Sequence, residues 1–401
     1  MRPDSLRAQE RESDRGEDRN EDLPRNIVYV ESNNAATGQN GILAYRRAPN
    51  GALTPLPGSP FLTGGRGFYV NKFPGPFDSD SEIVLDRRRG ILYAVNSGSS
   101  SVAALTIKRD GSLAPVAYSP FAIPGTNPIS LGLLGDNLLV LNADADPAQH
   151  IAGQHPNLVL TEIFRQTGGV APLPYGKIDL PDGGQPTQVL TTNTGRFIFT
   201  CEFFGGTVRS FVVDDRRTLR QVDIQTPPIQ PGATKPPLPL GLWAHDRAPI
   251  LYVAFVTAGL LGVYTWDQAG RLTFLRTAPT TGKAICWLRT GFGGARLYSM
   301  NTADNSIGVF DTTNPAEPKE IQHLVIGGLG GLVQFAVSPD NRFLYIIEQL
   351  NNPASPAAVA QGNRIRVAAI DPATGLVTEV PAATLRIDVP DNTIPQGVVV
   401  L

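Results

Sequence analysis

One segment recurs seven times along this chain: an apolar run, usually carrying Tyr or Phe, leads through a polar turn into a second apolar run. The seven copies are Ile27–Val30, Ile91–Asn96, Leu138–Asn142, Phe197–Phe199, Ile250–Val253, Arg296–Asn301 and Arg342–Glu348. Between Tyr29 and Tyr345 the intervals average about 53 residues, the period of a four-stranded propeller blade with some long loops. Seven copies therefore predict an all-β chain folded as a seven-bladed β-propeller of four-stranded antiparallel blades.

The copy around Phe199 shows how one blade divides into strands. We expect Thr187–Thr191 as the inner strand, the copy itself as the second, and the alternating segment Thr207–Val213 as the third. A glycine recurs in the turn between the third and fourth strands of five repeats, at Gly51, Gly111, Gly168, Gly270 and Gly375. Glycine readily adopts the positive φ that tight hairpins need, so these turns are expected to be short.

The two ends of the repeat array predict how the ring closes. The first copy begins at its second strand, and no inner strand precedes it. Residues Pro395–Leu401 resemble the inner strands of the other blades and have no blade of their own. We therefore expect them to pair with Ile27–Val30, so that one blade is built from both ends of residues 26–401 and the ring has no free edge.

The composition agrees with this fold and argues against nucleic acid and membranes as partners. The chain has 41 Gly and 35 Pro with 17% charged residues, as expected where many short strands each need a turn. A net charge of −2 gives no basic field for nucleic acid or an anionic membrane surface. No apolar run approaches the roughly 20 residues of a membrane-spanning helix. We expect a monomer that binds a small molecule and neither nucleic acid nor membrane.

Two further features concern the tail and the cysteines. Residues 1–25 carry six Arg and eight Asp or Glu and lack the apolar core of a signal peptide, which predicts a disordered charged tail and a cytoplasmic protein. Cys201 and Cys286 lie in apolar stretches without CxxC spacing, so we interpret them as buried thiols. The run Gly327–Gly331 precedes a strand rather than a helix, and no phosphate-binding cofactor is expected there.

The long insertions all fall on one side of the predicted ring. In a propeller, the first-to-second and third-to-fourth turns lie on one face, here called the turn face. The second-to-third turns and the links between blades lie on the opposite face, here called the loop face. The insertions at about 64–80, 143–156, 225–240 and 350–363 all belong to the loop face. Insertions gathered on one face of a repeat ring indicate the binding face.

Two carboxylates are candidates for chemistry on the loop face. Glu202 and Glu348 each lie three residues after the aromatic of their repeat, where the second strand reaches this face. A carboxylate beside an apolar blade core must be paired, hydrated or functional. The Asn residues at the same place in other repeats have the simpler interpretation of bonding the local strand end.

Residues just before the inner strands form the other expected wall of a pocket. Asn127, Gln185 and Lys283 hold this position in three repeats, and Lys283 or Arg66 could supply a cation for an acidic substrate. In the acidic loop, Asp78, Asp80 and Glu82 could offer hard oxygens to Ca²⁺. The alternative is that this loop is simply solvated.

With the repeats aligned, Phe335–Tyr345 and Asp304–Phe310 resemble the lactonase family of seven-bladed propellers, which includes bacterial 6-phosphogluconolactonase and fungal carboxymuconate lactonizing enzyme. The resemblance covers residues 26–401. Lactone-acting members place a His and an Arg near inner strands and a Glu at the end of a second strand, and Glu202 is similar to that Glu. No His stands near Asn127 and no Arg near Gln185.

The resemblance implies a lactonase-like hydrolase or cyclase that acts on a cyclic ester of a small sugar acid or carboxylated substrate, with Glu202 as the base. The missing His and Arg favour a second hypothesis, a non-catalytic propeller that binds a ligand or protein on the loop face. A third hypothesis is a cation-dependent gluconolactonase-like site on the acidic loop. Activity in the presence of a chelator would exclude the third.

Overall fold

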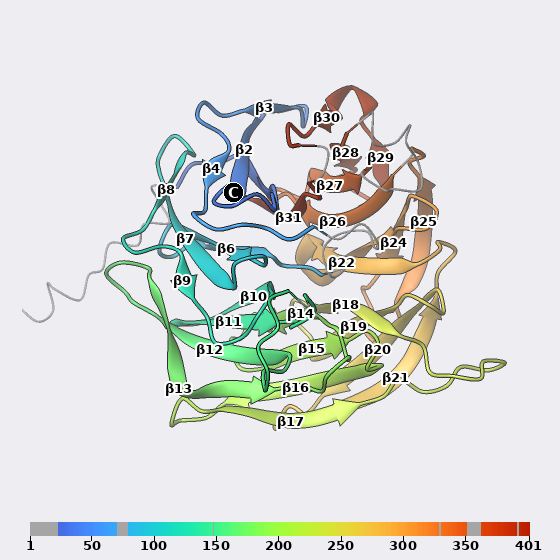
Figure 1. The fold of residues 1–401 in the computed structure, drawn as a ribbon. Coiled ribbons are helices and arrows are strands. Elements are labelled where there is room, and N and C mark those ends of the chain that lie inside the picture. Colours follow the sequence, from blue (N-terminus) through green and yellow to red (C-terminus); the bar gives the residue numbers. More distant parts are fainter. Residues whose placement is uncertain (1–22, 70–78, 147, 329, 351–361, 391–392) are drawn as a thin grey trace, which may run out of the picture.

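The computed structural model describes residues 23–69, 79–146, 148–328, 330–350, 362–390 and 393–401. Seven separate antiparallel sheets stand around a central axis, in the order of the sequence (Figure 1). The predicted all-β, seven-bladed propeller is confirmed. In the described residues the only helical segments are two 3₁₀ turns, Phe292–Gly294 and Pro381–Ala383, so no helix there is long enough to cross a membrane.

The first four blades contain the following strands, each blade given from its inner strand outward. Blade one is β31 (Gln396–Val400), β1 (Ile27–Glu31), β2 (Gly41–Arg47) and β3 (Leu53–Pro55), with β4 (Phe61–Leu62) beside β2. Blade two is β5 (Ile83–Asp86), β6 (Ile91–Asn96), β7 (Ser101–Ile107) and β8 (Leu113–Pro115), with β9 (Phe121–Ala122) beside β7. Blade three is β10 (Pro128–Leu134), β11 (Asn137–Asn142), β12 (Asn157–Ile163) and β13 (Val170–Asp179). Blade four is β14 (Pro186–Thr191), β15 (Ile198–Glu202), β16 (Thr207–Val213) and β17 (Leu219–Gln225).

The remaining three blades complete the ring. Blade five is β18 (Pro239–Ala244), β19 (Ile250–Phe255), β20 (Leu260–Trp266) and β21 (Leu272–Pro279). Blade six is β22 (Ile285–Gly291), β23 (Arg296–Asn301), β24 (Ser306–Asp311) and β25 (Lys319–Val325). Blade seven is β26 (Gly331–Val337), β27 (Phe343–Gln349), β28 (Arg364–Ile370) and β29 (Val377–Glu379), with β30 (Leu385–Arg386) beside β28.

The predicted closure of the ring is also confirmed. Strand β31 pairs antiparallel with β1, with Val28 opposite Val400 and Val30 opposite Val398. The backbone N–H of Leu401 donates to the carbonyl of Ile27 at 2.8 Å, which extends the pairing by one residue. The first blade is therefore made of strands from opposite ends of the propeller sequence. Residues 1–22, most of the predicted charged tail, lie outside the described residues.

The aromatic of the repeat and the glycine of the turn are hydrogen-bond partners across neighbouring blades. In four blades the Tyr hydroxyl donates to the turn-glycine carbonyl of the next blade: Tyr29 to Gly111 (2.9 Å), Tyr93 to Gly168 (2.9 Å), Tyr298 to Gly375 (2.9 Å) and Tyr345 to Gly51 (3.1 Å). Tyr252 donates to the carbonyl of Pro315 in the same way, at 2.9 Å. These bonds, here called the Tyr latches, explain why both positions recur. All five predicted turn glycines have positive φ, between 74° and 90°.

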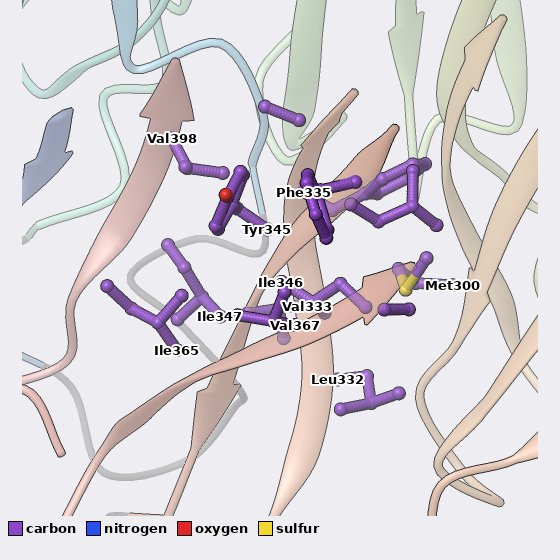
Figure 2. Packing of buried hydrophobic residues seen from close by; sticks show 14 of the residues in the cluster. Met300, Leu332, Val333, Phe335, Tyr345, Ile346, Ile347, Ile365, Val367 and Val398 are labelled. Atoms are coloured by element: carbon purple, nitrogen blue, oxygen red, sulfur yellow. The ribbon is translucent and has the colours of Figure 1, made fainter. Parts of the chain in front are cut away.

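The core lies between adjacent blades rather than in one central mass. The largest cluster joins blades six, seven and one, and Figure 2 shows Val398 of β31 beside Tyr345 of β27. Met300 of β23 and Phe335 of β26 belong to the same cluster and are fully buried. Side chains of β31 therefore pack against blade seven, while the backbone of β31 pairs with β1 of blade one.

Candidate functional site

The link that precedes β5 crosses the central channel. Its residues Ser79–Glu82, here called the channel segment, belong to blade two but contact inner strands of blades that lie across the ring. The Asp80 N–H donates to the carbonyl of Thr187 at 3.2 Å, and the Ser130 hydroxyl donates to the Asp80 carbonyl at 2.6 Å. The Gln334 amide donates to the carbonyl of Ser79. The segment thus reaches blades three, four and seven.

Burial of the channel segment changes the interpretation of the acidic loop. Asp80 and Glu82 are 1% and 0% exposed, so the alternative of a solvated loop is wrong for these two residues. Asp78, the third residue of the predicted Ca²⁺ site, lies outside the described residues. Both carboxylate oxygens of Asp80 are occupied by protein donors and do not point towards solvent.

Asp80 and Arg289 form a buried ion pair in the channel. Arg289 of β22 contacts both oxygens, with N–O distances of 2.6 and 2.7 Å. The amide of Gln188 and the backbone N–H of Ser81 add two further hydrogen bonds, at 3.2 and 2.8 Å. The Arg289 guanidinium also lies over the Trp243 ring, 4.6 Å from its centroid, a cation–π arrangement. A planar guanidinium suits both the bidentate pair and the stacking, so lysine would not replace it well.

A pocket of about 320 Å³ lies on one side of this ion pair. Asp80, Arg289 and Trp243 line it together with residues from the last positions of the inner strands, such as Val337 and Val400. Because inner strands run from the loop face to the turn face, this channel pocket extends towards the turn face. The insertions led us to expect the binding face on the other side, where the channel segment lies.

Arg87 is a positive charge at the edge of the channel pocket. Its guanidinium donates to the carbonyl of Val400 at 2.5 Å, and among the described residues no carboxylate forms an ion pair with it. Burial lowers the pKa of Arg87 without a compensating acidic neighbour. An unpaired, partly desolvated guanidinium at a pocket edge is suited to bind a carboxylate or phosphate.

Glu202, the predicted base, is buried at the loop-face end of β15. It is 1% exposed, and Arg209 of β16 donates from Nε to its Oε2 at 2.8 Å. The Thr207 hydroxyl donates to the same oxygen, whereas Oε1 is buried with no hydrogen-bond partner among the described residues. A Cβ built on Gly184 would lie 3.1 Å from Oε1, so backbone covers this carboxylate closely.

Glu348 has the same arrangement in blade seven. Its Oε2 accepts from Nε of Arg366 at 2.6 Å, and Arg366 also contacts Glu379 at 3.0 Å. In both blades the Arg lies opposite the residue two before the Glu, as the registers of Thr200 with Arg209 and Ile346 with Arg366 show. The Glu–Arg pair therefore occurs in two blades, four and seven. The signal in the sequence was an Arg at the third position of the third strand in these two blades.

The other predicted site residues lie apart from the channel pocket. Asn127 is fully buried and accepts from the backbone N–H of Asp146 at 2.9 Å, holding the loop after β11. Gln185 is half-buried with a positive φ of 50° before β14. Lys283 is exposed and Arg66 is half-buried, and neither they nor Asn127 and Gln185 line the pocket.

Arg289, Trp243 and Arg87 line the pocket but were not among the site residues expected from the sequence. A signal for Arg289 was present, because it is the one charged residue in the inner strand Ile285–Gly291, directly after the apolar run Ile285–Leu288. A buried cation in such a strand requires a carboxylate partner. The partner, Asp80, is 209 residues away in the sequence, so only the fold could show the pairing.

Comparisons with known proteins establish the fold. No family model matches the sequence, and no curated protein matches it. Similar solved structures include a protein from Lactobacillus plantarum, with a TM-score of 0.68 at 15% identity, covering 94% of this chain and 98% of that one. A protein from Bacteroides uniformis, provisionally described as a 6-phosphogluconolactonase, gives a TM-score of 0.67 at 16% identity and covers 92% and 98%.

A third similar structure is the periplasmic gluconolactonase of Pseudomonas aeruginosa, with a TM-score of 0.64 at 18% identity, covering 90% of this chain and 96% of that one. These similarities extend over nearly the whole propeller. This chain therefore has the seven-bladed fold of lactonase-like β-propellers, as the repeats and the family resemblance predicted.

Proposed function

We propose that this protein is a lactonase-like hydrolase, or cyclase, whose substrate is a small carboxylated lactone bound in the channel pocket. The observation that carries the proposal is the Asp80–Arg289 pair at the inner end of a cavity of about 320 Å³. The walls from Ile83, Val398 and Trp243 are largely apolar, which suits a lactone ring better than a heavily hydroxylated sugar. Arg87 at the pocket edge would bind the carboxylate.

Each step of lactone hydrolysis has a candidate group in this pocket. Asp80 would exchange its long hydrogen bond from Gln188 for one from the attacking water and accept that water's proton, while the water oxygen bonds to the carbonyl carbon. Arg289 would stabilise the developing oxyanion through its charge, because Asp80 already fixes the guanidinium at the wall of the pocket. The ring C–O bond then breaks, and the alkoxide leaves as an alcohol after taking up that proton. Cyclisation is the reverse sequence.

The test is turnover of a lactone panel that includes δ-gluconolactone, its 6-phosphate and a carboxylated γ-lactone. Hydrolysis is followed by pH-stat, and the spontaneous rate is subtracted. We expect Arg87→Gln to raise KM for the carboxylated lactone about tenfold and to leave KM for the neutral lactone unchanged, since one charge-assisted bond is worth about 1.5 kcal/mol.

Two further variants decide where the base lies. Asp80→Asn should abolish turnover if the channel pocket is the active site, whereas Glu202→Gln should abolish it if the predicted base on the loop face is correct. Thermal unfolding of each variant checks that lost activity does not reflect lost folding. Absence of turnover on every lactone above the spontaneous rate would contradict a hydrolase.

The occupied carboxylate of Asp80 favours a second function, binding without catalysis. With Arg289 on both oxygens and Gln188 on one of them, the carboxylate is held as a fixed recognition group. In that case the pocket would bind a small carboxylated ligand and release it unchanged. Calorimetric titration with the ring-opened hydroxy acid distinguishes the two functions, because binding without any lactone turnover supports only the second.

A further inference from the structure

Carboxylates outnumber cations at the loop-face end of the channel. Glu31 at the end of β1 is 0% exposed, as is Glu82 in the channel segment, and Asp80 is 1% exposed. Arg289 pairs with Asp80, and among the described residues no Lys, Arg or His forms an ion pair with Glu31 or Glu82. Two buried carboxylates are therefore in excess, and an uncompensated buried charge is too costly to persist.

Several oxygens in this region are buried without hydrogen-bond partners in the described part of the chain. They are Oε2 of Glu31, Oε2 of Glu82, Oε1 of Gln334 and Oε1 of Gln396, whose Nε2 is also without a partner. Gln334 and Gln396 are 1% and 0% exposed. Buried polar atoms are almost always paired in proteins, so four unpartnered oxygens in one region point to a ligand that the protein atoms do not supply.

The contacts of these side chains place them around one point. Gln334 donates from Nε2 to Oε1 of Glu82 at 3.1 Å, which fixes the orientation of its amide and leaves its oxygen unpartnered. Gln396 lies opposite Glu31 in the β1–β31 pairing. The next residue, Gly397, has a φ of 66°, and a Cβ built on it would lie 3.3 Å from Oε2 of Glu82. Glu82 therefore lies against the same strand that faces Glu31.

Glu31 also interrupts the repeat. It stands two residues after the aromatic Tyr29, and the same place in the other six blades holds Val95, Leu141, Cys201, Ala254, Met300 and Ile347. Those residues are all buried in the cores between blades. An apolar residue would serve packing equally well at this position. Replacement by Glu in one blade, next to Glu82, indicates a specific role for the pair.

We propose that Glu31 and Glu82 bind one divalent hard cation, Ca²⁺, together with the amide oxygens of Gln334 and Gln396. Carboxylate and amide oxygens are the ligands that Ca²⁺ takes in proteins, with water completing its shell, and its charge balances the two excess carboxylates. This set differs from the Ca²⁺ site predicted from the acidic loop, in which only Glu82 is shared. Among the described residues no group of three or more His, Cys, Asp or Glu could hold a metal ion. The proposed site has only two carboxylates, and its other two protein ligands are amides.

The alternative is that protons neutralise the carboxylates. Burial, and then the charge of Asp80, raise the pKa of Glu82 to about 8, and burial raises the pKa of Glu31 well above its usual range. Without a cation, the native state holds protons that the unfolded chain releases above pH ~4.5. Its stability must then fall as the pH rises towards 8, with Glu31, Asp80 and Arg289 as the charged groups facing Glu82. With a bound cation, stability should change little over this range.

The first experiment uses the wild-type protein purified without chelator and dialysed into metal-free buffer. We expect elemental analysis to find about one Ca²⁺ per chain, and chelator to lower the unfolding temperature by several degrees, reversed by adding Ca²⁺. No bound metal, together with an unfolding temperature that chelator and added Ca²⁺ leave unchanged from pH 5 to 8, would overturn the proposal. So would a chelator-independent loss of stability between pH 5 and 8, which identifies protons.

The second experiment is the double variant Glu31→Gln/Glu82→Gln. It keeps the side-chain volumes and removes both excess charges, so it should fold, lose the Ca²⁺ and lose its response to chelator. The control is Glu348→Gln, which removes a carboxylate of equal burial at a place where Arg366 already balances the charge, and it should retain the metal. Retention of Ca²⁺ by the double variant would place the cation elsewhere and overturn the ligand assignment.

Discussion

Replacing Tyr29 by Phe should destabilise the propeller by about 1–2 kcal/mol, because the substitution removes one Tyr latch and leaves the ring packing intact. The Tyr29 hydroxyl and the Gly111 carbonyl are both buried and lie 2.9 Å apart. A typical hydrogen bond contributes about 1 kcal/mol net, and a buried carbonyl left without a donor adds a desolvation cost of about the same size. The same cost is expected for Tyr93→Phe, whose latch reaches Gly168 in the next blade.

The matched control is Tyr264→Phe. Tyr264 is also fully buried, but its hydroxyl has no hydrogen-bond partner among the described residues. Burial raises the pKa of Tyr29 and of Tyr264 well above the usual range, so both hydroxyls are neutral and desolvated. Because an unpaired buried hydroxyl is unfavourable, the variant should be as stable as the wild type or more stable by up to about 1 kcal/mol.

Equilibrium unfolding in urea, followed by tryptophan fluorescence, measures these differences, provided that all variants share one m-value. The double variant Tyr29→Phe/Tyr93→Phe should lose the sum of the single effects, since the two latches share no partner. If Tyr264→Phe cost as much as Tyr29→Phe, ring packing rather than the hydrogen bond would explain the recurrence of Tyr in the repeats, and the Tyr latches would contribute no stability.

Three further outcomes are expected. Glu202→Ala should cost about 3–5 kcal/mol in urea unfolding, because it leaves the Arg209 guanidinium buried and unpaired; a loss below about 1 kcal/mol would show that this ion pair is dispensable. The Cys201 thiol, whose pKa burial raises to about 12, should resist a thiol reagent at pH 8 until the protein unfolds, and rapid labelling of the native protein would contradict its burial. Val400→Asp should prevent ring closure and leave little folded protein by size-exclusion chromatography, whereas Val325→Asp, at a position 58% exposed, should fold normally.

The fold could be predicted from the sequence because each blade repeats the same local pattern. The third strand Thr207–Val213 has the predicted bounds, and the inner strand of the same blade begins one residue earlier than predicted, at Pro186. Period-two alternation and turn glycines are local signals that span a few residues. The division of one blade into four strands could therefore be applied to the other blades. The ring closure could be predicted because the first repeat lacks an inner strand and the last strand-like segment, Pro395–Leu401, has no blade of its own.

The site could be predicted only in part, because its residues depart from the repeat. Glu202 and Glu348 were expected to be paired, hydrated or functional. Both are paired, but their partners Arg209 and Arg366 depend on strand register. Asp80 was expected near the channel mouth, as a Ca²⁺ ligand or in a solvated loop, but nothing within its neighbouring sequence indicates that it pairs with Arg289 inside the channel. The path of the channel segment is determined by donors and acceptors on strands far away in the sequence.

The channel segment has a consequence for how the molecule unfolds. In most repeat proteins each unit touches only its neighbours, so stability spreads along the array and terminal units can fray separately. Here four consecutive residues from one blade bond to blades three, four, six and seven. Opening any of those blades breaks contacts in the centre that the others share. The channel segment should therefore couple blades on opposite sides of the ring and make a ring of similar parts unfold as a single cooperative unit.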